Sequence, residues 1–232
     1  EEIGSPSSQR LTAALSKGKR YGLVMEPARA NGDLVSARKG GGVYELRVTG
    51  RAAHAGVEPE RGIHAIHELA HHILQLQALN GVEPGVTINV GWIEGGTTSN
   101  TVPAVARALI DVRVTTMEQM VSVARRIEQL TARPFLSGVQ LQLAGGITRP
   151  PMVKTRETLA LLQLMEEAGK ELGIPIRDTH TGGGSDGNFL AAHGVPTLDG
   201  LGPVGGNAHG EEEYLYLPSL VERSLLLATF LL

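Results

Sequence analysis

The sequence predicts an α/β domain of mainly parallel strands that is interrupted by an inserted α+β domain. Apolar runs alternate with helical patterns before and after a middle segment, which is typical of a parallel sheet. The middle segment, residues 41–148, has the order strand, helix, strand, strand, helix, strand. That order is typical of a ferredoxin-like antiparallel sheet covered by two helices. The outer domain then comprises residues 1–40 and 149–232.

Each element of the inserted domain is predicted from the spacing of its apolar residues. Residues with alternating apolar side chains predict strands at 43–49, 86–93, 104–114 and 139–143. Apolar residues at helical spacing predict helices at 62–79 and 117–130. The glycines at positions 40, 41 and 42 predict a break in the chain before the first of these strands.

The outer domain is predicted from shorter apolar runs. Residues 21–26 form a buried strand that ends in the carboxylate of Glu26, and residues 195–201 form a second one. Helices are expected at 157–172 and 217–232. Between them a glycine-rich segment, residues 181–185 and here called the glycine loop, leads into a short helix that begins at Asp186.

Composition excludes several classes of function. The chain has 232 residues, a net charge of -3, 41% apolar and 19% charged residues, so it is an ordinary globular protein. We expect neither nucleic acid nor a membrane as partner, since there is no basic excess and no long apolar span. Cysteine is absent, so metal would be held by His and carboxylates. The abrupt start without Met predicts that the natural N-terminus lies upstream. We expect a cytoplasmic rather than a periplasmic or secreted protein.

Acidic residues supply the first candidate chemistry. In the adjacent pair Glu1 and Glu2, one carboxylate can bind a metal while the other acts as a general base on a metal-bound water. Glu26 ends a buried strand, where sites form in open α/β sheets. The alternative for all three residues is a solvated carboxylate or a helix cap. Each residue considered alone favours this alternative.

Two glycine-rich segments supply further candidate binding residues. Gly182, Gly183 and Gly184 allow backbone N–H groups to approach an anion, beside the start of a helix. The alternative is a tight turn capped by Ser185 or Asp186. His209 lies in another glycine-rich segment with acidic residues after it, which suits a metal ligand, although an exposed loop histidine is the alternative.

Residues 67–71 read HELAH, which matches the two-histidine zinc signature of zincin proteases. No third ligand follows at the expected spacing. We therefore interpret this segment, with His64 and His72, as a polar helix surface that faces solvent, although surface histidines at this spacing can still bind stray metal.

In order along the chain, these segments resemble the zinc-dependent family of glutamate carboxypeptidase, acetylornithine deacetylase, succinyl-diaminopimelate desuccinylase and aminoacylase. The matching segments cover essentially the whole chain: Glu1–Ser5, Met25–Pro27, Thr49–Gly56, Gly95–Pro103, Asp111–Arg113, Gly183–Asp186 and Ala208–Tyr214. Any one of them is common by chance, whereas seven in the right order are a strong signal. The resemblance implies a zinc-exopeptidase-like catalytic domain interrupted by a lid, residues 41–148, that forms a homodimer.

The resemblance also implies roles for single residues. Glu1 would be the general base, and His54 would reach the partner's site and stabilise the oxyanion. Two zinc ions per active site would be held in part by Glu2, Glu26 and His209. A substrate carboxylate would be bound by Asn100 and Arg113 beside the glycine loop, and Arg149 is a second candidate anchor. For Arg113 the alternative is an ion pair with Asp111, which we judge the weaker interpretation.

The family has two further zinc ligands upstream, a His in a His-x-Asp motif and a bridging Asp, and neither precedes Glu1. We therefore expect this chain to be the C-terminal two-thirds of the protein, and to be inactive alone. The implied activity is hydrolysis of an amide bond next to a free carboxylate, in a small-molecule or peptide substrate, most closely that of a glutamate carboxypeptidase. Two alternatives stay open: an acetylornithine deacetylase- or aminoacylase-type amidohydrolase, and a non-catalytic dimerisation or binding homologue.

Overall fold

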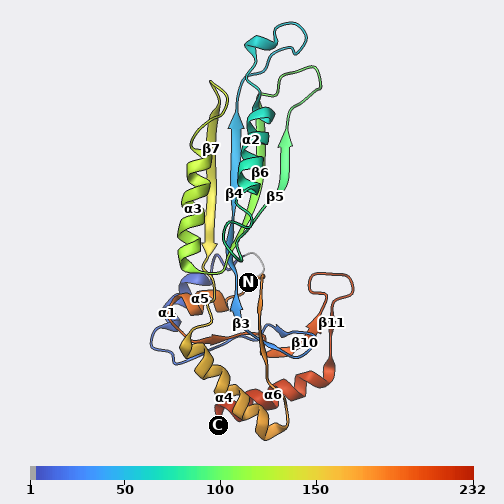
Figure 1. Cartoon of the computed structure of the whole chain (residues 1–232). Coiled ribbons are helices and arrows are strands. Elements are labelled where there is room, and N and C mark those ends of the chain that lie inside the picture. Colours follow the sequence, from blue (N-terminus) through green and yellow to red (C-terminus); the bar gives the residue numbers. More distant parts are fainter. Residues whose placement is uncertain (1–3) are drawn as a thin grey trace. The chain divides into compact units, whose positions relative to one another are not determined.

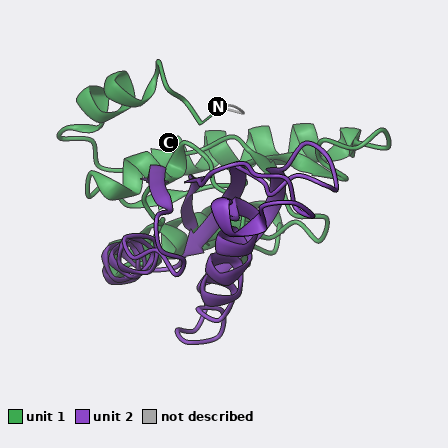
Figure 2. Cartoon of the chain, turned by 90° about the horizontal axis from the view of Figure 1, so that it is seen from above, with its two compact units in different colours: residues 1–39, 149–232 green, residues 40–148 purple. Residues whose placement is uncertain are grey.

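The structure is a computed structural model, and it describes residues 4–232. The chain divides into two compact units, each described by itself (Figure 2). Unit 1 comprises residues 1–39 and 149–232, and unit 2 comprises residues 40–148. The fold of the chain is mixed α/β. None of the helices in the described range combines the length and apolarity needed to cross a bilayer.

Unit 2 is a four-stranded sheet with the order β5-β6-β4-β7. Its elements along the chain are β4 (Gly40–Thr49), α2 (Ala65–Gln77), β5 (Thr87–Gly95), β6 (Val105–Val114), α3 (Met117–Thr131) and β7 (Gln140–Arg149), with a short 3-10 turn η1 (Pro59–Arg61) before α2. The pairs β4–β6 and β5–β6 are antiparallel, and Figure 1 shows β7 running opposite to β4.

Alternation along the strands of unit 2 separates a buried face from an open one. Leu46 and Val48 of β4 and Ile110 and Val112 of β6 are fully buried, with 0% exposure, and pack in one apolar core. Both helices cover this face, and Ile127 of α3 is completely buried in the same core. At about 25 cal/mol per Å² of buried apolar surface, such side chains each contribute roughly 1.5–3 kcal/mol. The odd-numbered residues of β6 lie on the open face.

The glycines at positions 40–42 do not break the chain, contrary to our expectation, but begin β4. A Cβ at Gly42 would overlap the backbone carbonyl of Gly146 on β7, and one at Gly41 would lie 2.6 Å from the Val112 carbonyl oxygen. The missing side chains therefore allow the neighbouring strands to approach.

Unit 1 contains seven short strands and four helices in the described range. The helices are α1 (Gln9–Ser16), α4 (Arg156–Leu172), α5 (Gly187–Ala192) and α6 (Leu217–Leu231). The strands are β1 (Gly22–Leu23), β2 (Pro27–Ala28), β3 (Leu34–Arg38), β8 (Asp178–Thr181), β9 (Thr197–Leu198), β10 (Gly202–Gly206) and β11 (Tyr214–Leu215). Buried Leu34, Leu161, Met165, Leu198 and Leu226 form its core.

Strand pairing in unit 1 agrees in part with the expectation of a mainly parallel sheet. The pairs β1–β9, β2–β10 and β3–β8 are parallel, whereas β10–β11 is antiparallel, and hydrogen bonding divides these strands into three small sheets. Three of the four strand pairs in unit 1 are thus parallel, but they belong to separate small sheets rather than to one.

Candidate functional site

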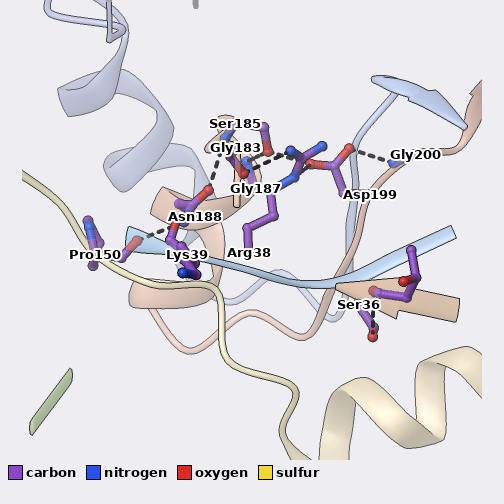
Figure 3. A network of polar contacts seen from close by, with 11 residues as sticks. Ser36, Arg38, Lys39, Pro150, Gly183, Ser185, Gly187, Asn188, Asp199 and Gly200 are labelled. Carbon is purple, nitrogen blue, oxygen red and sulfur yellow. Dashed lines mark hydrogen bonds and ion pairs between the residues drawn. The ribbon is translucent and has the colours of Figure 1, made fainter. Parts of the chain in front are cut away.

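The glycine loop in unit 1 is held in place by a buried ion pair (Figure 3). Arg38, at the end of β3, donates from Nε to Asp199 Oδ2 at 2.7 Å and from Nη1 to the Gly183 carbonyl oxygen at 3.1 Å. Ser185 Oγ donates to the same Asp199 oxygen and accepts from the Gly187 N–H. Because Arg38, Ser185 and Asp199 are buried, the contacts among them are little weakened by solvent.

Asn188 connects the glycine loop to both places where the chain passes between the units. Its Oδ1 accepts from the Ser185 N–H at 2.9 Å. Its Nδ2 donates to the carbonyl oxygens of Lys39 at 3.1 Å and Pro150 at 2.8 Å. Lys39 is the last residue of unit 1 before unit 2, and Pro150 is the second residue after the chain returns.

Arg149 lies against the same loop. A Cβ at Gly184 would be 2.5 Å from its Cδ atom, so only glycine permits this packing. The Arg149 guanidinium also lies 5.1 Å from the centre of the Phe189 ring, as in a cation–π contact. The structure therefore brings together Arg149 and the glycine loop, four of the residues predicted to bind substrate.

Glu26 lies beside the start of β10, where its carbonyl oxygen accepts from the Gly202 N–H at 3.0 Å. Its carboxylate acts on Arg29: burial and the neighbouring Arg38 lower the pKa of the Arg29 guanidinium, and Asp199 and Glu26 oppose this. Glu26 thus belongs to a cluster of two arginines and two carboxylates, formed with Arg29, Arg38 and Asp199.

His209 follows β10 in a segment with unusual backbone. Asn207 and His209 both have positive φ, 58° and 65°, a conformation that non-glycine residues rarely adopt. The His209 N–H donates to Glu213 Oε2 at 3.3 Å. Such conformations concentrate at binding and catalytic sites, which is consistent with a metal-binding role for this segment.

A metal site is not assembled by the described residues alone. Within residues 4–232, no group of three or more His, Asp or Glu side chains is arranged to hold a metal ion. Glu26 and His209 have the oxygen and imidazole donors that zinc accepts. Glu1 and Glu2 lie outside the described residues, so the structure says nothing about their predicted roles.

In unit 2, the structure brings together His54 and Asn100. Their segments pair through a bridge between His54 and Thr101, and the Ala55 N–H donates to the Asn100 carbonyl oxygen at 2.9 Å. The Gly56 N–H donates to His54 Nδ1 at 3.1 Å. A neutral His54 therefore carries its proton on Nε2, from which it can donate to a developing negative charge.

Arg113 lies elsewhere in unit 2 and is not beside Asn100 as we expected. It pairs with Gly41 at one end of the sheet, whereas Val105, nearer Asn100 in sequence, pairs with Thr49 at the other. Eight residues of strand correspond to about 27 Å. Arg113 also forms the ion pair that we had judged the weaker interpretation: Nε and Nη2 each donate to an Asp111 oxygen at 2.8 Å.

The HELAH segment is only in part the solvent-facing surface that we expected, because His64 and His67 are exposed but Glu68 and His72 are not. Glu68 and His72 are buried, with 0% and 1% exposure, and are hydrogen-bonded at 2.8 Å. The Glu68 carboxylate also accepts from the N–H groups of Phe135 and Leu136, both at 2.7 Å. His67 is exposed and His71 is half-buried, with their Nε2 atoms 3.1 Å apart. A glutamate committed to two backbone donors is not available as the base of a zincin.

Sequence reasoning missed Arg38, Asn188 and Asp199. A signal existed for Asp199, since it ends a buried apolar run as Glu26 does. The sequence contains no comparable signal for Asn188 or Arg38, because their hydrogen-bond partners lie up to 161 residues away in the chain.

Comparison with known proteins agrees with these observations. Residues 36–138 match the model of the peptidase dimerisation domain. Carboxypeptidase G2 of Pseudomonas sp. (strain RS-16) is 27% identical over 238 residues, which cover 100% of this chain and 57% of that protein. Succinyl-diaminopimelate desuccinylase of Methylococcus capsulatus is 29% identical over 85% of this chain and 53% of its own length. The chain thus spans little more than half of these relatives.

Solved structures share the fold. A tripeptidase from Staphylococcus aureus superposes with a TM-score of 0.84 at 22% identity, covering 99% of this chain and 61% of its own. A dinuclear metal-binding peptidase of the M20 family from Bacillus subtilis has a TM-score of 0.69 at 19% identity, with 99% and 61% covered. The resemblance inferred from the sequence is thereby confirmed: residues 36–138 match a peptidase dimerisation domain, and the chain is similar along its length to carboxypeptidase G2 and to succinyl-diaminopimelate desuccinylase.

Proposed function

We propose that the protein is a subunit of a dimeric, zinc-dependent hydrolase that cleaves an amide bond next to a free carboxylate, as a glutamate carboxypeptidase does. The observation that carries the proposal is the placement of His54 beside Asn100 on a dimerisation domain, with Nδ1 held as an acceptor by Gly56. An exposed imidazole whose Nε2 carries a proton is suited to stabilising the oxyanion of amide hydrolysis.

Zinc fits the donor types of the candidate ligands. Glu26 and His209, with Glu2, would hold part of a two-metal site, and the absence of Cys agrees with an oxygen and nitrogen ligand set. When bound, the metal would supply a water of lowered pKa. Glu1 would hold the proton released from that water, and His54 and Asn100 would bind the carbonyl oxygen of the substrate.

Two separate features favour a substrate carboxylate. Arg113 presents two parallel N–H donors, and both donate to the Asp111 carboxylate at 2.8 Å, which is the geometry that binds a carboxylate with two hydrogen bonds. The side chains of Arg113 and Asp111 are each about one-third exposed, so their ion pair contributes little stability. A substrate carboxylate can therefore replace Asp111 as the partner of Arg113 at little cost in free energy. Arg149, which lies against Gly184 of the glycine loop, is a second candidate cation for a substrate carboxylate.

The dimer is proposed to form through the β5 edge of unit 2. Among the strands of residues 4–232, β6 is the one that pairs with β5, so the other edge of β5 is open. A bulge at Gly91 shifts the register, and beyond it Trp92 and Ile93 are 43% and 62% exposed. The other edge, β7, exposes no large apolar side chain and is interrupted by Gly145 and Gly146. An apolar open edge is a template for pairing with a second copy.

The dimer also explains how His54 and Arg113 can act on one substrate. Within one copy they lie near opposite ends of the sheet, about 27 Å or more apart. An amino acid with a short acyl group cannot span that separation. The two residues therefore contact one substrate only if they belong to different copies.

Mixing of inactivated subunits tests this proposal in the intact protein. His54→Ala and Arg113→Ala homodimers should each hydrolyse N-acyl glutamate poorly. A mixed dimer contains one site with both residues intact, so up to half of the wild-type activity per dimer should return. Activity that does not return on mixing would show that the residues act within one copy. An inactive wild-type protein would instead favour the non-catalytic homologue.

The side chain of the substrate separates the remaining alternatives. Faster hydrolysis of N-acyl ornithine than of N-acyl glutamate would indicate an acetylornithine deacetylase-type enzyme. Comparable rates on several N-acyl amino acids would indicate an aminoacylase-type enzyme.

A further inference from the structure

Asn188 is fully buried in unit 1 and uses its side-chain amide completely for connections between backbone segments. Its carbonyl oxygen accepts from Ser185, and its two N–H groups donate to Lys39 and Pro150. The partners determine the orientation of the amide, because a backbone N–H needs an acceptor and two carbonyl oxygens need donors.

The three partners belong to three functionally different places. Ser185 ends the glycine loop, Lys39 is the last residue before the chain enters unit 2, and Pro150 follows its return. The segments before and after unit 2 are also joined directly, since Arg38 and Met152 exchange two backbone hydrogen bonds of 2.9 and 3.0 Å. The Arg38 side chain continues from there to the Gly183 carbonyl oxygen.

Displacement of either crossing segment therefore acts on the loop. Lys39 also donates its N–H to the Thr181 carbonyl oxygen at 3.0 Å, at the first residue of the loop. Thr181 and Ser185, the two ends of the loop, are thus both tied to Lys39, the second through Asn188. Buried polar networks of this kind behave as units, because each lost bond leaves an unsatisfied group.

From this arrangement we propose that Asn188 is a positioning residue, which couples the glycine loop to the two segments that carry the chain into and out of the dimerisation domain. The proposal rests on the proposed function in taking the loop as part of the substrate site. Asn188 does not touch substrate. It sets the path of the loop and makes that path depend on Lys39 and Pro150.

The variant Asn188→Asp separates the two halves of this connection. Aspartate keeps the oxygen that accepts from Ser185 and replaces the two donors with an oxygen that repels the Lys39 and Pro150 carbonyls. Asn80→Asp is a matched control, because Asn80 in unit 2 also bridges backbone groups, donating to and accepting from Ile88 at 2.8 Å. Both variants are made in the intact protein.

Two measurements are compared between these variants and the wild type. In Asn188→Asp, amide hydrogen exchange of Arg38 and Met152 should accelerate about tenfold, and KM should rise about tenfold with kcat changed less than about threefold. Asn80→Asp should leave both unchanged. Accelerated exchange at Arg38 and Met152 without a rise in KM would overturn the coupling, as would a KM equal to that of Asn80→Asp.

A measurement on the wild type covers the case in which Asn188→Asp does not fold. Saturating glutamate, the expected product, should slow exchange of the Arg38 and Met152 amides about threefold or more, through about 0.7 kcal/mol of coupling. Unchanged exchange at both amides with glutamate bound would overturn the proposal. If the wild type neither binds glutamate nor hydrolyses N-acyl glutamate, the proposed function fails; where Asn188→Asp folds, its exchange rates compared with wild type then decide whether Asn188 holds the crossing segments.

Discussion

Arg38 and Asp199 form an ion pair of 2.7 Å in which the two side chains are only 6% and 0% exposed. The Asp199 carboxylate also accepts from Ser185 and from the Gly200 N–H, so its charge is fully surrounded by donors. A charge buried in this way depends on its partners, because removal of one leaves the other without solvation.

Replacement of Arg38 by Met should therefore destabilise unit 1 by about 3–5 kcal/mol. The change in unfolding free energy is measured by urea denaturation, monitored by far-ultraviolet circular dichroism. The control is Arg61→Met, since Arg61 pairs with Glu58 at 3.0 Å in an exposed position, where the loss should be below about 1 kcal/mol. Equal losses in the two variants would mean that the buried pair does not stabilise the fold.

Glu68 should make stability depend on pH. Burial acts to raise the pKa of its carboxyl, but hydrogen bonds from the Phe135 and Leu136 N–H groups and from His72 outweigh burial and lower it. Because the pKa is lower in the folded state, the stabilisation is present above the unfolded value of about 4.3 and is lost as the pH falls through the folded value.

The variant Glu68→Gln should thus lose about 1–3 kcal/mol of unfolding free energy at pH 7, and its deficit should shrink as the pH falls below about 4. Denaturation at a series of pH values measures this difference. Glu60→Gln, at an exposed position in η1, should show no such trend. A deficit that is constant with pH would contradict the ionised state of Glu68.

Charge placed on the β5 edge should prevent dimerisation. Ile93 is 62% exposed beyond the Gly91 bulge, and in the proposed dimer a lysine there would be buried against the second copy. We expect Ile93→Lys to be monomeric by sedimentation at concentrations where the wild type is a dimer. Val121→Lys on α3, which replaces a side chain of 57% exposure, should remain dimeric.

Arg113 should determine the preference for a free carboxylate. Lysine cannot reproduce its two parallel donors, so Arg113→Lys in the intact protein should lower the ratio of kcat/KM for N-acyl glutamate to that for its α-amide by about tenfold. Arg107→Lys is the control, because Arg107 lies on the same face of β6 and binds Glu94 at 2.5 Å. A wild type that cleaves the α-amide equally well would exclude this role of Arg113.

Zinc binding should be incomplete in the 232-residue chain. The described residues supply Glu26 and His209 but no set of three ligands. We therefore expect fewer than two tightly bound zinc ions per chain and no amide hydrolysis, by metal analysis and a product assay. Two tightly bound zinc ions with turnover would show that other residues are the ligands.

The elements of unit 2 could be predicted from the sequence because their burial is one-sided. Helix α3 and strand β6 each show the spacing of a half-buried element. Strand β3 was missed because nearly all of its residues are buried, which removes the alternation, and β8 because its sequence, DTHT, has no apolar residue. Both are stabilised as strands by pairing with each other across more than 140 residues.

The candidate site was predictable only where a residue acts through its own type and neighbours. His54 is held by Gly56 two residues away, and the glycine loop by its own composition. The orientation of Glu68 was not predictable, because it is determined by backbone donors 67 and 68 residues further along the chain. The separation of Arg113 from Asn100, by contrast, follows from the strand predicted at 104–114, because Asn100 precedes that strand and Arg113 lies near its end.

The hydrogen-bonded contact between Arg38 and Met152 has an evolutionary consequence. The chain leaves unit 1 and re-enters it at two neighbouring positions, as in a loop whose ends are already closed. An ancestral protein with a short turn at this point could acquire residues 40–148 in one genetic insertion without rearranging its strands. The same adjacency makes this the place at which a protein engineer would replace the whole insertion with a few residues of glycine and serine.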